Sequence, residues 1–332
     1  MTYSPPFTIS PKILDNVMRI TEALTQANLG RSGIALPHLR RTNRLRSLHS
    51  SLAIEGNGLS LDEVTAVIEG KTVAGPKDEI TEVRNAYAAY EDLDSFDPFE
   101  KEDILRAHAV MMEGLVDSAG SFRTGSEGVF DGEGNIVYIA PGPEFVPLMM
   151  DNLLRWTKES EYSMIVKSCV FHYQFEYIHP FEDGNGRIGR LWQTLLLSRF
   201  DASFKWMAIE SVIRKHQKGY YDAIERSNQV GDCTVFVEFM TGVIYEALTE
   251  TAEALVGEEA GRVRMSSKET ALYTLIRDGY FTDIDQAAEL MGVSRPTLSR
   301  CIRSLKDKGL IEKEGNRKSG VWHIVRSDEG AD

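Results

Sequence analysis

The sequence predicts a mainly α-helical protein with one small β-hairpin. Apolar residues recur at helical spacing through most of the 332 residues. The stretch 122–142 differs, because it is rich in glycine and carries short β-branched and aromatic pieces. No apolar run approaches the roughly 18 residues that a membrane span needs, so we expect no membrane partner.

The first helix is expected over 10–29 and the second over 38–54, which ends at Gly56-Asn57-Gly58, a sequence typical of a C-cap and turn. Ser60-Leu61-Asp62-Glu63 is a capping box that opens a third helix. In 122–142, two short strands flank a polar tip, and Pro141 ends the hairpin. Further helices are expected over 78–95, 100–116, 144–158, 161–178, 185–199, 211–229 and 232–256.

The length suggests two domains and a third small one. Residues 257–266 break the apolar periodicity and indicate a linker. We therefore divide the chain into an N-terminal helical region (1–95), a central domain (96–256) and a C-terminal unit (267–326) with three helices and two strands.

Charge is distributed unevenly along the chain. The net charge is −13, yet residues 263–326 contain twelve Lys/Arg and eight Asp/Glu, or +4. An acidic body with a basic tail indicates that the tail can meet a polyanion. The three cysteines, Cys169, Cys233 and Cys301, are odd in number and lack metal-ligand spacing. They favour a reducing compartment, so we expect a cytoplasmic protein without disulfides.

The most informative segment is 179–190. Its glycines, Gly184 and Gly186, flank Asn185 just before a predicted helix, so backbone N–H groups can approach a ligand closely. The helix N-terminus adds partial positive charge, which makes this an anion site. Arg187 and Arg190 are three residues apart and project from one helix face. Two cations at an anion site favour a polyphosphate over a single carboxylate.

Two further side chains complete this pattern. Asp183 offers hard oxygen ligands beside the expected phosphates, where Mg²⁺ would lie. His179 titrates near neutral pH and is the natural general base. Each residue alone is also compatible with an ordinary capped helix and a structural histidine. A histidine and aspartate metal hydrolase is disfavoured, because no second His or Cys lies at ligand spacing.

The segment resembles the signature of the Fic family, His-Pro-Phe-x-Asp/Glu-Gly-Asn-Gly-Arg-x-x-Arg, and meets every defined position. Fic proteins mostly transfer AMP from ATP to a hydroxyl of a target protein or of themselves. The resemblance therefore implies a Fic-type helical bundle and a protein adenylyltransferase with ATP as substrate. The phosphotransferase branch of the wider family carries Lys where this chain has Gly186, so that position favours AMP transfer.

The resemblance also implies roles for individual residues. His179 would deprotonate a Ser, Thr or Tyr of the target, and Asp183 would hold Mg²⁺ across the α- and β-phosphates. The loop Gly184-Asn185-Gly186 would cradle the phosphates. Arg187 would neutralise charge on the leaving pyrophosphate, and Arg190 would hold the γ-phosphate.

Two further segments are similar to parts of the family. Tyr220 and Tyr221, with Asn228, resemble its adenine and ribose wall, although a tyrosine pair in a helix is also typical of packing. The hairpin at 122–142 resembles the flap that pairs with an extended target segment, although it can also be a plain surface hairpin. The expected docking residues of this flap are Val129, Ile136, Val137 and Tyr138.

Upstream, Ser51-Leu52-Ala53-Ile54-Glu55-Gly56 resembles the family's inhibitory signature, Ser/Thr-x-x-x-Glu-Gly/Asn, in the class with an N-terminal inhibitory helix (here 38–56). Ser51 and Glu55 are four residues apart and share a helix face. Glu55 is expected to pair with Arg190 in place of the γ-phosphate and to misalign ATP. An alternative is that Glu55 orients water for removal of AMP from a modified target.

The C-terminal unit resembles a winged helix-turn-helix, with 295–308 as recognition helix and 314–320 as wing. Residues 292–326 contain nine basic and three acidic residues, which suits a phosphate backbone. Winged helices also mediate protein contacts, so two functions stay open: an AMP transferase with an accessory domain, and a DNA-binding regulator whose Fic domain is inactive or senses nucleotide. A homodimer is compatible with either. The expected DNA contacts are Arg295, Thr297, Ser299, Arg300, Arg303, Arg317 and Lys318.

Overall fold

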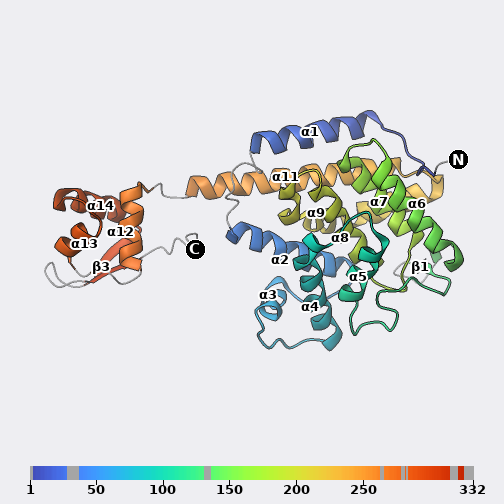
Figure 1. Ribbon diagram of the computed structural model, residues 1–332, viewed down its shortest axis with the longest axis horizontal. Coiled ribbons are helices and arrows are strands. Elements are labelled where there is room, and N and C mark those ends of the chain that lie inside the picture. The colour runs from blue at the N-terminus through green and yellow to red at the C-terminus, as the bar shows by residue number, and fades with distance from the viewer. Residues whose placement is uncertain are drawn as a thin grey trace. The chain divides into compact units, whose positions relative to one another are not determined.

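The computed structural model confirms a mainly α-helical protein (Figure 1). It forms two compact units, residues 1–253 and 254–332, which we describe separately. The structure describes residues 3–27, 37–130, 136–261, 265–277, 281, 283–314 and 321–324.

The N-terminal part of the first unit is helical. The helix α2 ends at Ile54, and Gly56 follows with a φ of +96°, as expected for a glycine that terminates a helix. The capping box at the start of α3 is present, with Ser60 and Glu63 bonded reciprocally. The helices are α1 (Pro11–Ala27), α2 (Pro37–Ile54), α3 (Leu61–Ile68) and α4 (Lys77–Glu91), followed by the 3-10 helix η1 (Leu93–Ser95).

The middle of the first unit contains the predicted hairpin. Its strands β1 (Gly128–Phe130) and β2 (Ile136–Ile139) pair antiparallel, with Val129 opposite Tyr138. The polar tip, 131–135, lies outside the described residues. The helices here are α5 (Lys101–Met111), η2 (Pro143–Phe145), α6 (Val146–Glu159), α7 (Met164–Ile178) and α8 (Asn185–Ser198).

Two element predictions were wrong. The helix expected over 211–229 is two helices, α9 (Ile209–Lys215) and α10 (Gln217–Val230), because His216 between them adopts a non-helical φ of −111° and ψ of 30°. The linker expected at 257–266 was wrong in its first half, since α11 (Thr234–Gly261) runs through 257–261. Glu258-Glu259-Ala260 favour helix, and an established helix tolerates Gly257 at a cost of about 1 kcal/mol. The remaining element is η3 (Ala202–Trp206).

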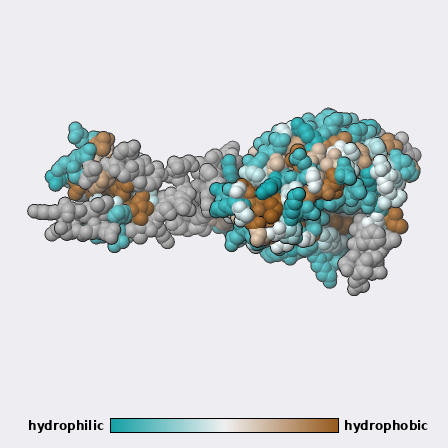
Figure 2. Space-filling view, turned by 90° about the horizontal axis from the view of Figure 1, so that it is seen from below, coloured by the Kyte–Doolittle hydropathy of each residue, from teal (hydrophilic) through white to brown (hydrophobic). Residues whose placement is uncertain are grey.

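The helices α7 and α8 pack against each other at the centre of this unit. Residues 165–175 of α7 are all buried, so the helix is enclosed on every side. The helices α1 and α11 run side by side (Figure 1), and Asn16 donates to Thr241 between them. Hydrophilic residues predominate on the face that Figure 2 shows. Among the described residues, no helix combines the length and apolar character needed to cross a bilayer.

The second unit has its own core. Three helices precede a two-stranded antiparallel sheet, as expected from the sequence. Buried leucines such as Leu272, Leu298 and Leu305 form the centre. The elements are α12 (Ser267–Arg277), α13 (Ile284–Leu290), α14 (Arg295–Asp307), β3 (Ile311–Glu314) and β4 (Val321–Ile324).

Candidate active site

The loop between α7 and α8 has an unusual backbone at both ends. His179 terminates α7 with a φ of 49°, and in the described chain it is the one non-glycine residue with positive φ. Gly184 precedes α8 with a φ of +83°. A Cβ at Gly184 would lie 2.7 Å from the sulfur of Met112, so glycine is required both by conformation and by space. These turns bring the imidazole of His179 and the N-terminus of α8 into one site.

Asn185 locks this loop. Its side-chain oxygen accepts from the Phe181 backbone N–H at 2.9 Å, and its amide donates to the Phe181 carbonyl at 2.8 Å. Both polar groups of the Asn185 side chain are therefore used to hold the loop conformation. No side chain caps the N-terminus of α8. The partial positive charge of that first turn therefore remains available to an anion.

His108 supports the loop from α5, and the sequence did not predict it. The ring stacks on Phe181 with centroids 3.6 Å apart. Its Nδ1 accepts from the Gly120 backbone N–H at 2.9 Å, so Nε2 carries the proton that is donated to the Asp183 carbonyl, also at 2.9 Å. Burial lowers the pKa of His108, consistent with this neutral form.

Arg187 links the loop to α4. Its guanidinium contacts Glu82 at 2.9 Å and Asp183 at 3.0 Å, and its side chain is only 4% exposed. The carboxylate of Asp183, by contrast, is 57% exposed. One carboxylate face of Asp183 is therefore open to solvent beside a buried cation.

Arg190 and Glu55 form the ion pair expected from the sequence, with Nη2 and Oε1 2.7 Å apart. Arg190 is almost fully buried, and its Nε and Nη2 also donate to the hydroxyl and carbonyl of Ser51 at 3.0 and 2.9 Å. A Cβ on Gly186 would lie 2.3 Å from Oε1 of Glu55. The carboxylate of Glu55 therefore lies directly against the first turn of α8, and only glycine at 186 leaves room for it.

His179 has the properties of a neutral base. Its Nδ1 is buried and has no hydrogen-bond partner among the described residues. Burial is the main reason why its pKa is lowered, and the charge of Arg123 lowers it further. The imidazole is therefore uncharged at neutral pH and free to accept a proton.

Arg123 connects the hairpin to His179, and no sequence pattern pointed to it. The side chain is 4% exposed and donates to four backbone carbonyls: His179 at 2.6 Å, Gly125 at 2.8 Å, Pro141 at 2.5 Å and Ile178 at 3.3 Å. These acceptors include the last carbonyls of α7 and both ends of the hairpin. A single buried guanidinium thus fixes the left-handed turn at His179 and the base of the hairpin together.

Replacing Arg123 with glutamine is expected to destabilise the first unit by about 2–4 kcal/mol, because one buried and three part-buried hydrogen bonds to backbone carbonyls are lost. Urea unfolding followed by circular dichroism measures this loss. Arg155→Gln, which changes an exposed arginine on α6, is the matched control and should lie within about 0.5 kcal/mol of wild type. Equal midpoints for the two variants would show that the Arg123 contacts contribute little.

A titratable group near the site was also missed. The side chain of Glu176, one turn before His179, is 12% exposed, and its buried Oε1 has no hydrogen-bond partner among the described residues. Burial, followed by the charge of Glu55, raises the pKa of Glu176 to about 8. It is therefore mainly protonated at neutral pH and does not cancel the positive charge of Arg190.

The predicted nucleotide wall is divided between core and surface. Tyr220 is 2% exposed and its hydroxyl bonds Nε2 of His172 at 3.0 Å. Burial lowers the pKa of His172 to about 3, so this contact is between neutral groups. Tyr221 is exposed, and its hydroxyl lies 3.4 Å from the carbonyl of Ile54, next to Glu55. Asn228 accepts from Tyr173 at 2.8 Å.

Of the predicted flap residues, Tyr138 donates its hydroxyl to the Tyr177 carbonyl at 3.1 Å, close to the end of α7. Val129, Ile136 and Val137 lie in the paired strands. The hairpin is thus attached to the helix that ends at His179.

In the second unit, α14 presents a basic surface. Arg295, Ser299, Arg300 and Arg303 are exposed and Thr297 is half-buried. Arg295 contacts Asp285 at 3.2 Å. Arg317 and Lys318 lie outside the described residues.

We compared the sequence and the structure of this chain with those of known proteins. The Fic/DOC family profile matches residues 98–197. A crystal structure of a Fic family protein from Desulfovibrio desulfuricans is 36% identical and superposes with a TM-score of 0.81 over 99% of this chain and 100% of that one. The chain belongs to the Fic/DOC family. A Caenorhabditis elegans Fic-1 fragment, 22% identical over 74% of both chains with a TM-score of 0.60, shares the Fic fold.

Curated Fic relatives carry a functional name. "Protein adenylyltransferase Fic" of Aedes aegypti is 28% identical over 221 residues, or 63% of this chain and 42% of that protein. A "probable protein adenylyltransferase" of Aquifex aeolicus is 26% identical over 196 residues, 57% of this chain and 58% of that protein. This Fic protein thus matches about two fifths of the length of its insect relative.

Proposed function

We propose that this protein transfers AMP from ATP to a hydroxyl group of a target protein or of itself. The observation that carries the proposal is the site at the start of α8, where a buried arginine and an uncapped helix N-terminus hold a carboxylate near the His179 base. Such a site suits the phosphates of a nucleotide. The names of the curated relatives support AMP as the group transferred.

The chemistry follows from the charges. The hydroxyl oxygen of the target attacks the α-phosphorus, the bond from that phosphorus to the β-phosphate oxygen breaks, and pyrophosphate leaves. His179 accepts the hydroxyl proton because its imidazole is neutral. Arg187 and Arg190 offset the negative charge that develops on the leaving group. The hairpin, attached at its base through Arg123, would align the target segment by strand addition.

Asp183 fits a magnesium ion shared with the phosphates. Its carboxylate is more than half exposed, and Mg²⁺ in nucleotide sites is bound by one or two carboxylates plus phosphate oxygens. The ion would neutralise phosphate charge. Arg187, 3.0 Å from the same carboxylate, would orient it.

We infer that Glu55 inhibits transfer. Its carboxylate pairs with Arg190 and lies where a γ-phosphate would bind, so ATP must either displace it or bind with its α-phosphate misplaced. Because the pair is formed within the chain, no partner is needed to impose the inhibition. In the alternative reaction, the same Glu55 carboxylate orients a water molecule that removes AMP from a modified target.

Incubation with ATP and Mg²⁺ followed by mass spectrometry tests the reaction type. A mass increase of one AMP on the protein supports transfer. An unchanged mass in both wild type and Glu55→Gly would contradict it.

A second function, DNA binding by the C-terminal unit, is favoured by the exposed basic residues of α14. We expect Arg300→Ala with Arg303→Ala to weaken a DNA mobility shift at least about tenfold, since phosphate contacts by arginine dominate such affinities. Arg226→Ala with Arg84→Ala, at exposed arginines of the first unit, is the control. Identical shifts for both double variants would exclude α14 as the DNA surface.

A further inference from the structure

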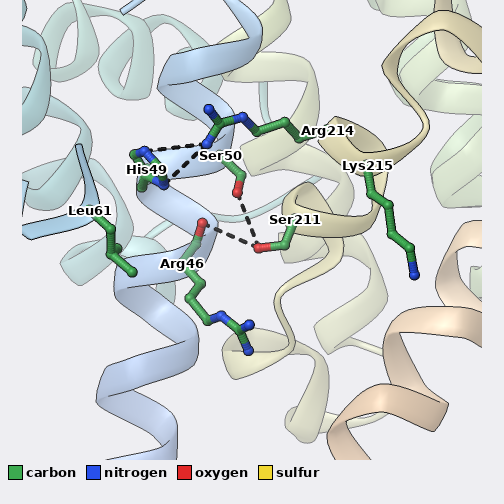
Figure 3. Close-up of a pocket in the computed structure, with 7 residues that line it drawn as sticks. All are labelled: Arg46, His49, Ser50, Leu61, Ser211, Arg214 and Lys215. Carbon is green, nitrogen blue, oxygen red and sulfur yellow. Dashed lines mark hydrogen bonds between the residues drawn. The ribbon is translucent and has the colours of Figure 1, made fainter. Parts of the chain in front are cut away.

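A second cationic pocket lies between α2 and α9, apart from the site at α8 (Figure 3). Its volume is about 400 Å³, within the range of small-molecule sites. Both helices belong to the first unit and pack against each other. The pocket is lined by Arg46, His49, Ser50, Leu61, Ser211, Arg214 and Lys215.

The positive charge of this pocket is not neutralised locally. Within the described part of the chain, neither Arg46 nor Arg214 has an ion pair with a carboxylate. Nη1 of Arg214 instead lies 3.2 and 3.3 Å from the two ring nitrogens of His49. Burial lowers the pKa of His49, and the charge of Arg214 lowers it further. In a chain of net charge −13, Arg46 and Arg214 are exposed arginines without a carboxylate partner at one hollow, an arrangement that attracts anions.

Lys215 is different from these arginines. Its ammonium lies 2.7 Å from Glu246 and 3.0 Å from Glu250, both on α11. In Figure 3 it extends away from the histidine and serines. The charge of Lys215 is therefore neutralised by these two glutamates, and the charges available to a ligand are those of Arg46 and Arg214.

Two hydroxyl groups lie between the arginines. The Oγ atoms of Ser50 and Ser211 are 3.1 Å apart, and Ser211 donates to the Arg46 carbonyl at 3.3 Å. In Figure 3 the side chains of Arg214 and Arg46 extend on either side of this serine pair. Because Ser211 donates to the Arg46 carbonyl, Ser50 is the donor in the serine pair, and the guanidinium groups of Arg46 and Arg214 are the groups left to donate to phosphate oxygens.

We propose that this pocket binds the phosphate group of a small phosphorylated molecule and thereby holds α2 against α9. Arg46, His49 and Ser50 are spaced i, i+3 and i+4 on the α2 face toward α9. Ser51 lies on the adjoining face and contacts Arg190 of α8. An anion between α2 and α9 would therefore stabilise the placement of the same helix that ends at Glu55.

Calorimetric titration of the full chain with pyrophosphate in magnesium-free buffer tests the site. We expect Arg46→Gln with Arg214→Gln to bind at least tenfold more weakly than wild type, and single Arg214→Gln to show an intermediate loss. Arg226→Gln, at an exposed arginine on α10, should bind like wild type. The variants keep every residue of the α8 site, so pyrophosphate bound there has the same direct contacts in all of them.

Hydrogen exchange gives a second readout that does not depend on AMP transfer. We expect pyrophosphate to slow exchange of α2 amides in wild type and not in the double variant. Equal pyrophosphate affinity in wild type and double variant, or no binding by wild type at millimolar concentration, would overturn the proposal. If pyrophosphate binds and the exchange of α2 amides does not change, the anion does not hold α2 against α9. This result does not depend on whether the chain transfers AMP.

Discussion

Replacing Glu55 with glycine is expected to raise the initial rate of self-modification about tenfold or more, equivalent to about 1.4 kcal/mol. The substitution removes the carboxylate that lies 2.7 Å from Arg190 and against Gly186. The γ-phosphate can then take its place, and Arg190 stays anchored by its two bonds to Ser51. Intact-mass spectrometry over time in ATP and Mg²⁺ measures the rate.

Glu69→Gly is the matched control for this variant. Glu69 is also a carboxylate at a helix end, the C-cap of α3, and it pairs with Arg41 at 2.8 Å. It should leave the rate unchanged, because it lies outside the α8 site. Equal rates for Glu55→Gly and wild type would remove Glu55 as an inhibitor.

Replacing His179 with alanine in the Glu55→Gly background is expected to reduce transfer at least about 100-fold, the usual contribution of a general base. ATP binding should persist, because the phosphates are held by α8 and its arginines. Transfer is measured by mass spectrometry and binding by calorimetry.

Because the backbone at position 179 has a positive φ, alanine could disturb the turn, and a second variant separates this effect from the loss of the imidazole. The φ of 49° costs alanine more than asparagine, which adopts this conformation more readily. His179→Asn therefore keeps the turn while removing the base, and it should be as inactive as His179→Ala. Retained turnover in the asparagine variant would show that the imidazole is not the base.

Local sequence predicted the parts of the fold whose cause is local. Helical periodicity, the capping box at Ser60 and the glycines around Asn185 act over a few residues, and the structure has each of them. Glu55 and Arg190 are 135 positions apart in the sequence. Their contact was predicted from the resemblance of two motifs to the Fic family. The break at His216 was missed because periodicity alone continues across it.

The supporting residues of the site could not be found in this way. Arg123 donates to carbonyls of residues 125, 141, 178 and 179, and His108 contacts Gly120 and Asp183. Backbone carbonyls and N–H groups exist at every position, so their partners leave no pattern in the sequence. Tyr220 lies in the core and bonds to His172, and its place in a nucleotide wall stays a prediction.

The proposed mechanism requires that the turn entering α8 holds a triphosphate so that its α-phosphorus faces an incoming hydroxyl. Incubation of Glu55→Gly protein with Mg²⁺ and ATP labelled at either the α- or the γ-phosphorus tests this placement of the nucleotide. We predict that label from the α-position becomes attached to protein and that label from the γ-position is released as pyrophosphate. If the γ-label, or neither label, becomes attached, the nucleotide is not placed in this way.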